Sequence, residues 1–438
     1  MTESLERLHE PNRHSSAHPG GAANLVGPLI EMLAGPTPLR FDFWDGTSWG
    51  PAGGAATAHL RSVDALRWLL WAPGELGAAR AFVVGDIDIE GDIFEAIRAL
   101  RRSGSNLRTG LRALPRTAAA ARRLGAIGRP LPPPPEETRP RGRRHSTARD
   151  ATVVAHHYDV GNEFYRLVLG PSMTYSCARF ADPAMSLAEA QASKHDLVCR
   201  KLGLHQRQGL RLLDVGCGWG AMAIHAASDY GAHVVGVTIS RQQLESARQR
   251  VDEAGLADQV EIRLQDYRDL TNERFDAISS IGMSEHVGKA RIAEYFATLS
   301  SLLAPHGRLL NHAISTIGGS KIEGRTFMAR YVFPDGELVD VGDTVQAMQR
   351  AGLEVRDVES LREHYALTLR QWVANLEEHW TAAVTLVGPR RARVWRLYMA
   401  ASAIGFEDGG LNVHQVLGVI AGPEGTSAMP PTRDGWAT

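Results

Sequence analysis

A glycine-rich turn is the first feature of the sequence that could do chemistry. The run LRLLDVGCGWG ends at Gly220, with Gly216 and Gly218 completing a G-x-G-x-G spacing and Asp214 two residues before the first glycine. Glycines let a ligand approach the backbone closely, and the helix pattern that follows would place that ligand at a helix N-terminus. The spacing and the acid favour S-adenosylmethionine over the pyrophosphate of a dinucleotide, which stays the alternative.

Polar residues also follow the next two strand-like runs. Thr238 and Gln243 stand where many methyltransferases carry an acid for the ribose hydroxyls, and both can hydrogen-bond hydroxyl groups. Asp266 is placed to accept from the adenine amino group, and Tyr267 to pack on the ring. The competing interpretation makes Asp266 a helix cap or a solvated loop acid.

The elements that would position these residues alternate between strand and helix from residue 151 onward. The strand-like runs are LRLLDVG, HVVGVTI, VEIRL, FDAISSI and GRLLNHAI, with helical patterns such as SRQQLESARQRVDEAG between them. This alternation predicts an α/β fold, a Rossmann-like class I methyltransferase with a doubly wound, mostly parallel sheet. We assign the catalytic domain to residues 151–425, with ligands at the carboxyl ends of the strands.

The preceding part of the chain predicts a small α+β domain over residues 21–105. Residues 22–33 form a short amphipathic pattern, and residues 38–50 alternate in hydrophobicity and turn at Asp45-Gly46, as a hairpin would. No chemistry stands out here, and we expect association with lipid or membrane.

Residues 106–150 are predicted to be an Arg- and Pro-rich linker. Between residues 101 and 150, thirteen arginines face three acids, and the run LPPPPEE is typical of a stiff connection. The arginines are either a solvated tether or, over residues 101–149, a contact with anionic lipid headgroups worth about 1 kcal/mol per basic residue. RNA binding is disfavoured because no aromatic residues are interleaved, and no nucleic-acid partner is expected.

Composition bounds the setting of the protein. The chain has 438 residues and a net charge of −1, and its three cysteines, Cys177, Cys199 and Cys217, have neither metal-ligand spacing nor an even count. Residues 1–20 carry acids without an apolar run, so we expect a disordered tail rather than a signal peptide, and residues 426–438 a second polar tail. No segment is long and apolar enough to span a bilayer, which predicts a cytoplasmic protein, peripheral at the inner face of the membrane.

Several longer motifs narrow the interpretation to one family. They read HYDVGN at 157–162, PSMTYSC at 171–177, GMSEHVG at 282–288, NHAI at 311–314 and HYALTL at 364–369. With them the chain resembles the cyclopropane-fatty-acyl-phospholipid synthase family, which includes the mycolic acid cyclopropane synthases, over about residues 150–420. The runs PGELG and GDID within residues 56–100 resemble the amino-terminal domain of the longer members.

The resemblance implies a set of site residues. In the family a bicarbonate ion beside the reacting carbon acts as general base, and the matching positions are Cys177 and Ile314 through their main chains, with Glu285, His312 and Tyr365. The cofactor would be S-adenosylmethionine, leaving S-adenosylhomocysteine as product, and no metal is implied. Positions that match the family's cofactor site, besides the glycine turn, Thr238, Gln243 and Asp266, are Tyr175, Ser176, Ile281 and Gly282. Ser284 departs from the phenylalanine that many members carry.

The implied chemistry explains why a base is held there. Methyl transfer to an alkene creates a carbocation, which must lose a proton from the new methyl carbon before water captures it. An anionic base next to Glu285 is electrostatically awkward unless Glu285 is protonated or accepts a hydrogen bond from the base. Tyr158 and Trp372 are candidates to stabilise the cation through their faces. We expect His286 to be structural and Cys177 not to be a nucleophile.

Two products and two other functions stay open. The cation can close to a cyclopropane, or undergo a hydride shift and yield a 10-methylene chain, which a separate flavin or nicotinamide reductase could turn into a 10-methyl branch. The substrate would be the cis double bond of an unsaturated phospholipid in the bilayer, and the protein a homo-oligomer, most simply a dimer. The alternatives are a heteroatom methyltransferase, for which no N-P-P-Y-type motif occurs, and a non-catalytic membrane-binding protein.

Overall fold

The computed structural model divides into two compact units, each described here by itself. The first comprises Met1–Glu137 with Arg393–Ala401, and the second comprises Thr138–Ala392 with Ser402–Thr438. The structure describes residues 21–35, 37–103, 107–138, 160–322, 324–334 and 336–436. Three parts of the chain that carried predictions lie outside the described residues. They are the predicted tail at 1–20, all five arginines between residues 139 and 149, and His157, Tyr158 and Asp159 of the first family motif.

The first unit contains a four-stranded sheet with the order β2-β1-β3-β4. Its strands are β1 (Arg40–Phe43), β2 (Ser48–Trp49), β3 (Ala56–Leu60) and β4 (Ile87–Gly91), and its helices are α1 (Ala22–Ala34), α2 (Asp64–Trp71), α3 (Glu75–Val84), α4 (Ile93–Ser103) and α5 (Leu107–Arg123). The predicted hairpin is confirmed, because β1 and β2 pair antiparallel with Phe41 opposite Trp49. The helix predicted at 22–33 is confirmed as α1, and the α+β character of the unit agrees with the sequence.

The segment predicted as a linker is more structured than expected in its described part. Helix α5 includes the run TAAAARR, whose alanines favour helix although Pro115 lies inside it. After the helix, the Trp71 indole donates to the Gly128 carbonyl at 3.0 Å. Arg80 and Glu137 form an ion pair at 2.7 Å with the carboxylate 1 % exposed. The arginine and proline content predicted a linker without tertiary contacts. These contacts instead place the described residues up to 137 within the first unit.

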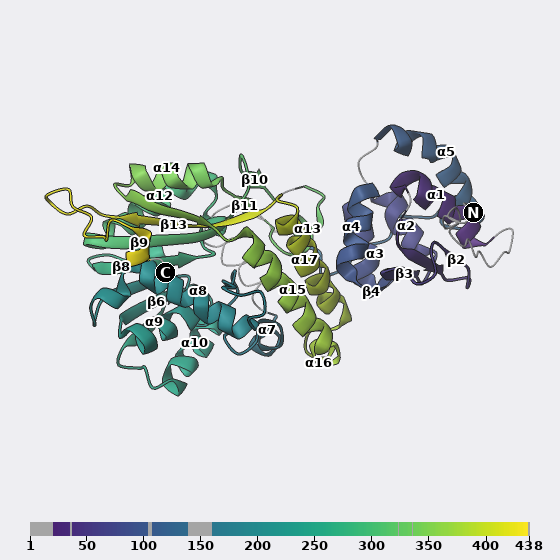
Figure 1. Ribbon diagram of the computed structural model, residues 1–438. Helices are drawn as coiled ribbons and strands as arrows, with labels where there is room; N and C mark the ends of the chain where they lie inside the picture. The colour runs from purple at the N-terminus through teal and green to yellow at the C-terminus, as the bar shows by residue number, and fades with distance from the viewer. Residues whose placement is uncertain are drawn as a thin grey trace, which may run out of the picture. The chain divides into compact units, whose positions relative to one another are not determined.

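The second unit is built on a seven-stranded sheet with the order β12-β13-β9-β8-β5-β6-β7 (Figure 1). The strands β5 to β9 run parallel and correspond to the five predicted runs. Their bounds are Arg211–Val215 (β5), His233–Thr238 (β6), Val260–Leu264 (β7), Phe275–Ile281 (β8) and Leu303–Ser315 (β9). The sequence analysis did not identify β12 (Glu354–Ser360) and β13 (Asn412–Val419), which pair antiparallel at one edge. The predicted fold class is confirmed.

Helices cover both faces of this sheet, because neighbouring residues of a buried strand point to opposite sides. Leu212 belongs to a core with α8, α9 and α10, and Leu213 to a core with α12 and α14. These helices are Leu187–Leu202 (α8), Ala221–Tyr230 (α9), Arg241–Glu253 (α10), Ile292–Ser301 (α12) and Val341–Arg350 (α14). Helix α8 begins at a capping box between Ser186 and Glu189 and ends at Gly203, whose left-handed conformation terminates it.

The remaining elements lie around the carboxyl ends of the strands or extend the unit. They are α7 (Asn162–Leu169), α11 (Ser284–Val287), α13 (Phe327–Tyr331), α15 (Arg362–Glu378), α16 (Trp380–Val387) and α17 (Pro389–Glu407), with the short pair β10 (Ser320–Lys321) and β11 (Glu337–Leu338). Within the described residues no helix is both long and apolar enough to cross a bilayer. The predicted polar tail at 426–438 differs from expectation, since Trp436 is 4 % exposed and joins the core. Arg433 also pairs with Asp357 at 3.1 Å.

Candidate active site

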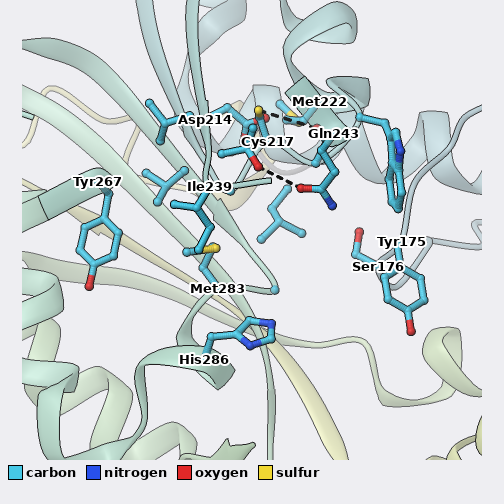
Figure 2. A pocket seen from close by; sticks show the side chains of 18 of the residues that line it. Tyr175, Ser176, Asp214, Cys217, Met222, Ile239, Gln243, Tyr267, Met283 and His286 are labelled. Carbon is cyan, nitrogen blue, oxygen red and sulfur yellow. Dashed lines mark hydrogen bonds between the residues drawn. The ribbon is translucent and has the colours of Figure 1, made fainter. Parts of the chain in front are cut away.

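A cavity of about 190 Å³ opens at the carboxyl ends of β5, β6, β7 and β8 (Figure 2). Eleven of the twelve residues predicted from the sequence to bind the cofactor line it. They are Tyr175, Ser176, Asp214, Gly216, Gly218, Thr238, Gln243, Asp266, Tyr267, Ile281 and Gly282. The exception is Gly220, which is the N-cap of α9 with φ +79°. The parallel sheet thus brings together residues that lie more than a hundred positions apart.

The two glycines of the turn that line the cavity, Gly216 and Gly218, differ in which atoms lie next to them. A Cβ atom on Gly216 would lie 2.3 Å from Sδ of Met283, so the protein itself requires this glycine. A Cβ atom on Gly218, where φ is +54°, would meet no atom within 4 Å. The open space above Gly218 is the room that a ligand lying against the turn needs.

Asp214 closes the inner end of the cavity at the end of β5. Its Oδ1 accepts a hydrogen bond from the Ser279 hydroxyl at 2.7 Å, whereas its buried Oδ2 has no partner among the described residues. Burial raises the pKa of Asp214 to about 6, and the bonds to Ser279 and the charge of Lys194 oppose this rise. A carboxylate oxygen without a donor suits the ammonium group of S-adenosylmethionine.

Thr238 and Gln243 form a buried pair at the end of β6. The Thr238 hydroxyl donates to Oε1 of Gln243 at 2.9 Å and accepts from the Ser240 main-chain N–H at 3.2 Å. Ser240 is the N-cap of α10 and accepts from the Gln243 N–H at 3.3 Å. The helix start therefore holds both side chains in the cavity wall, where they can exchange partners with ribose hydroxyls.

Asp266 follows the end of β7, where it lines the cavity and also caps a short helix. It caps this helix, Tyr267–Asp269, by accepting from the Arg268 N–H at 3.0 Å. The Arg268 guanidinium contacts it at 2.6 Å. Burial disfavours the Asp266 carboxylate, but the hydrogen bonds from Arg268 outweigh burial and lower its pKa. Tyr267 packs edge-on against Tyr295 with ring centroids 5.0 Å apart.

Two of the five predicted catalytic positions are hydrogen-bonded to each other, and a third, His312, lies on the same strand as Ile314. The Ile314 N–H of β9 donates to Oε1 of Glu285 in α11 at 2.8 Å, and the Gly282 N–H donates to the His312 carbonyl at 2.8 Å. Gln415 of β13 lies 3.3 Å from Nδ1 of His312. Burial raises the pKa of Glu285 to about 7, and the bond from Ile314 limits the rise. Burial and the charges of Lys194 and Lys201 hold the pKa of His312 well below its usual value.

The other two positions meet at the start of α15. The Cys177 thiol lies 3.6 Å from the Leu361 carbonyl, and the Ala178 N–H donates to the Thr368 hydroxyl at 3.0 Å. Tyr365 lies between Leu361 and Thr368 on this helix. Burial raises the pKa of the Cys177 thiol, which agrees with the expectation that Cys177 is not a nucleophile.

A single main-chain link joins these two groups of residues. The Leu361 N–H donates to the Val413 carbonyl at 2.9 Å, and Val413 of β13 pairs with Ile314 of β9. None of the five catalytic positions is among the residues that line the cofactor cavity. Glu285 and Ile314 instead line a second cavity of about 10 Å³, together with Ser284, which is room for about one water molecule.

Two polar atoms of this region lack partners in the described parts of the chain. They are Oε2 of Glu285 and Nε2 of His312, and both are buried. If the Gln415 amide donates to Nδ1 of His312, the proton of the neutral ring is on Nε2, which is then a donor. Oε2 of Glu285 is also a donor when the carboxyl group is protonated. A buried donor without an acceptor is costly, so each of these two atoms is a candidate contact for a bound group.

An aromatic side chain lies between the two regions. Trp372 of α15 is 0 % exposed, and its ring lies 5.2 Å from Tyr175 of the cofactor cavity and 6.0 Å from Tyr365. Its indole N–H has no partner among the described residues. Trp372 therefore links the cofactor cavity to Tyr365 through ring contacts, and its role beside a cation stays a prediction. Tyr158, the other aromatic candidate, lies outside the described residues.

Comparison with known proteins decides the family. The family model for mycolic acid cyclopropane synthetase matches residues 145–416. The chain belongs to this family. Its fold and cavity agree with that membership, and it is an S-adenosylmethionine-dependent C-methyltransferase whose reaction class is lipid modification.

Individual relatives of the family extend the likeness to the whole chain. The protein is 43 % identical to a probable fatty acid methyltransferase of Mycobacterium tuberculosis, with 92 % of this chain and 95 % of the relative covered. It is 38 % identical to the cyclopropane-fatty-acyl-phospholipid synthase of Escherichia coli K12, with 60 % and 67 % covered. The crystal structure of mycolic acid cyclopropane synthase CmaA1 complexed with SAH and CTAB matches with a TM-score of 0.57 and 32 % identity, covering 61 % and 98 % of the two chains.

Sequence reasoning missed a buried lysine in the cofactor cavity of this family member. Lys194 of α8 is 0 % exposed, lines the cavity, and donates to the Ser176 hydroxyl at 3.0 Å. Burial lowers the pKa of Lys194 to about 7, although nearby Asp214 opposes this. The signal was present, because Lys194 and Lys201 occupy the same three- and four-residue spacing as the apolar residues of α8.

His286, which was expected to be structural, also lines the cavity, as Figure 2 shows. Met283 beside it was not identified in the sequence and forms the wall opposite Gly216. Both follow β8 directly, where parallel-sheet enzymes place functional side chains.

Proposed function

We propose that the protein transfers a one-carbon unit from S-adenosylmethionine to the cis double bond of an unsaturated acyl chain in a membrane phospholipid. The observation that carries this proposal is the buried, incompletely bonded pair Glu285 and His312 next to a cavity with methyltransferase geometry. A methyltransferase that acts on a basic nitrogen can release the proton of its product to water. Addition to an alkene needs a base inside the site, because the carbocation must lose its proton before water captures it.

The chain's residues around the cofactor cavity orient the electrophile. Bound S-adenosylmethionine supplies an activated methyl group. Asp214 holds the ammonium end through its free oxygen, the Thr238 and Gln243 pair binds the ribose, and Asp266 and Tyr267 bind the adenine. This set fixes the direction in which the methyl group faces the substrate, and orientation contributes strongly to a reaction with so weak a nucleophile.

Aromatic side chains protect the cation that the addition creates. Trp372, Tyr175 and Tyr365 pack against one another, and their faces can stabilise a positive charge while they exclude water. A dry surround is required because water would otherwise capture the cation and give an alcohol.

The polar group beyond these rings fits a bicarbonate ion. Glu285 and His312 would hold it through their unpartnered atoms, with the main chains of Cys177 and Ile314 and the Tyr365 side chain completing the site. The ion would supply the general base for the proton of the new methyl carbon. The pKa of about 7 for Glu285 supports this assignment, since a protonated carboxyl donates to an anion instead of repelling it.

The product is a cyclopropane or a 10-methylene chain, and one cation leads to both. Ring closure accompanies loss of the methyl proton in the first case, and a hydride shift precedes it in the second. Nearly full-length likeness to a probable fatty acid methyltransferase supports an acyl chain as the acceptor. If the product is the methylene chain, a separate flavin or nicotinamide reductase would convert it to a 10-methyl branch. The C-methyltransferase family speaks against both alternatives considered from the sequence, a heteroatom methyltransferase and a non-catalytic protein.

The setting we propose is a dimer on the cytoplasmic face of the membrane. Of the arginines within residues 101–149, those in the described part that support headgroup contact are Arg116, Arg122, Arg123 and Arg129, all exposed. Their removal should weaken binding to anionic vesicles and reduce its salt sensitivity.

The proposal is tested with the purified full chain, S-adenosylmethionine and phospholipid vesicles. We expect cofactor consumption with cis-unsaturated vesicles and none with saturated ones. Mass spectrometry of the lipid should show a gain of about 14 mass units, the mass of one CH₂ carried by this chemistry, and NMR separates ring protons from methylene protons. Consumption that is independent of the double bond would overturn the proposal.

A further inference from the structure

The short helix α16 exposes apolar side chains to solvent. It reads WTAAVTLV, contains no charged residue, and buries Ala383 alone of its eight residues. Leu386 is 49 % exposed, and Val384 and Val387 are half-buried. A helix at the surface of a soluble domain normally turns its apolar residues inward and its polar residues outward. Helix α16 departs from this pattern toward its carboxyl end, where Leu386 is exposed alongside Thr385, and the two valines are covered only in part.

Two arginines follow this helix at an unfavourable place. Helix α17 begins at Pro389, and its first turn holds Arg390 and Arg391 without any acid. Positive charge near a helix N-terminus is opposed by the helix dipole, so this arrangement costs stability. At the other end of α16, Glu377 and Glu378 of α15 are exposed. The apolar face is therefore bordered by positive charge at its carboxyl end and by negative charge at its amino end.

The same helix adjoins the side chains that lead to the cofactor cavity. Helix α16 packs on α7, and Figure 1 shows it close to α7 at the end of α15. Tyr165 of α7 lies 4.6 Å from Trp219 and 5.7 Å from Tyr175, ring centroid to ring centroid, and both partners line the cavity. Asn375 of α15 fixes α7 by donating to the Val168 carbonyl at 2.9 Å. One layer of packed rings separates the exposed helix from the site.

We propose that α16, with Arg390 and Arg391, lies against an anionic phospholipid bilayer and inserts its carboxyl end, around Leu386, below the headgroups. This inference rests on the proposed function and adds to it the side of the catalytic unit from which the acyl chain arrives. Apolar side chains next to arginines are the composition of helices that lie in the membrane interface. Glu377 and Glu378 keep the amino end of the helix in water, so it meets the bilayer tilted.

The test uses the full chain and vesicles of equal parts phosphatidylglycerol and phosphatidylcholine with cis-monounsaturated chains. Leu386→Glu should weaken vesicle binding about tenfold or more, because it replaces inserted apolar area with a charge that the anionic surface repels. Arg390→Gln and Arg391→Gln should each weaken it about fivefold at low salt, and the effect should shrink at high salt. The matched control is Val358→Glu on β12, which changes a side chain that is 44 % exposed elsewhere in the same unit; its vesicle binding should equal that of the native protein.

Two further measurements separate the outcomes. S-adenosylmethionine binding by calorimetry should be the same in all four variants, which shows that the fold is intact. Native-level vesicle binding by Leu386→Glu overturns the proposal, and so does a change in molar mass without lipid that leaves vesicle binding intact, since α16 would then be an interface between copies. Vesicle binding is measured without turnover, so a protein that binds through α16 but adds no carbon contradicts the proposed function alone.

Discussion

The cofactor cavity and the region around Glu285 differ in how far the chain satisfies its own polar groups. In the cavity, Thr238 bonds Gln243 and Asp266 is held by Arg268, and among the described lining residues only Asp214 has a buried side-chain oxygen without a partner. Around Glu285, a carboxyl oxygen and a ring nitrogen of His312 are buried without partners in the described chain. Side chains that already hydrogen-bond each other can exchange those partners for a ligand at little cost in free energy. Buried polar groups without a hydrogen-bond partner destabilise the fold unless a ligand binds them. The second region is therefore where the chemistry specific to this enzyme is expected.

The largest effect should come from Glu285→Ala. Alanine neither accepts from the Ile314 N–H nor donates to an anion, so we expect turnover to fall by about 10²- to 10⁴-fold. S-adenosylmethionine binding should change less than twofold, because Glu285 does not line the cofactor cavity. Unchanged turnover would show that the region around Glu285 does not carry the chemical step separately from cofactor binding.

The pH dependence of turnover sharpens the same point. Glu285 is protonated below its raised pKa of about 7, and its ionisation above that pH would place a second negative charge beside the anion. We expect the rate with saturating substrate to decline as pH rises through this value. Measured under single-turnover conditions, a rate that instead rises across this range would assign the anion-binding role to other groups.

A smaller effect is expected from Asp214→Asn, which acts on the cavity alone. The amide keeps an oxygen for the Ser279 hydroxyl but loses the charge that attracts the ammonium of the cofactor. Affinity for S-adenosylmethionine by calorimetry should fall about 10- to 100-fold, the range for a lost hydrogen bond to a charged group. Turnover at saturating cofactor should stay within about threefold of native if Asp214 only binds.

The two glycines give a third contrast within the cavity. Both Gly216→Ala and Gly218→Ala strain a positive φ by about 1 kcal/mol, but only the first pushes a new Cβ into Met283. We expect Gly216→Ala to unfold at the lower denaturant concentration and Gly218→Ala to lose more cofactor affinity. In a Met283→Ala background the difference in stability between the two should disappear. A difference that survives would mean that Met283 is not its cause.

The smallest effect concerns Lys194, whose pKa lies at about 7 in the folded chain against an ordinary value of 10.5. Between these values the unfolded chain binds more protons, so stability rises with pH, and below pH 7 the full cost of burying the ammonium is present. Lys194→Met should raise the melting temperature by a few degrees at about pH 6.5, and the gain should vanish near pH 10. A gain independent of pH would point to packing rather than charge.

Local patterns predicted most of the fold. The five parallel strands, helix α1 and the hairpin in the first unit follow from hydrophobic periodicity and turn residues, which act between neighbours in the chain. The segment after residue 106 and the last residues were interpreted from composition alone. Composition cannot predict that Glu137 forms an ion pair with Arg80, or that Trp436 packs into the hydrophobic core.

The sequence by itself determined that the glycine turn, Thr238 and Asp266 lie close together, because the carboxyl ends of parallel strands must meet at one edge of the sheet. It could not determine the burial of Lys194, the orphan atoms of Glu285 and His312, or the exposure of α16. Those properties depend on which residues pack against each side chain. Many of these residues belong to β13, α7 and α15, which are distant in the sequence. Desolvation is a property of the packed surroundings and not of a residue type, so the tertiary structure alone decided where charge is costly and where a base can be held.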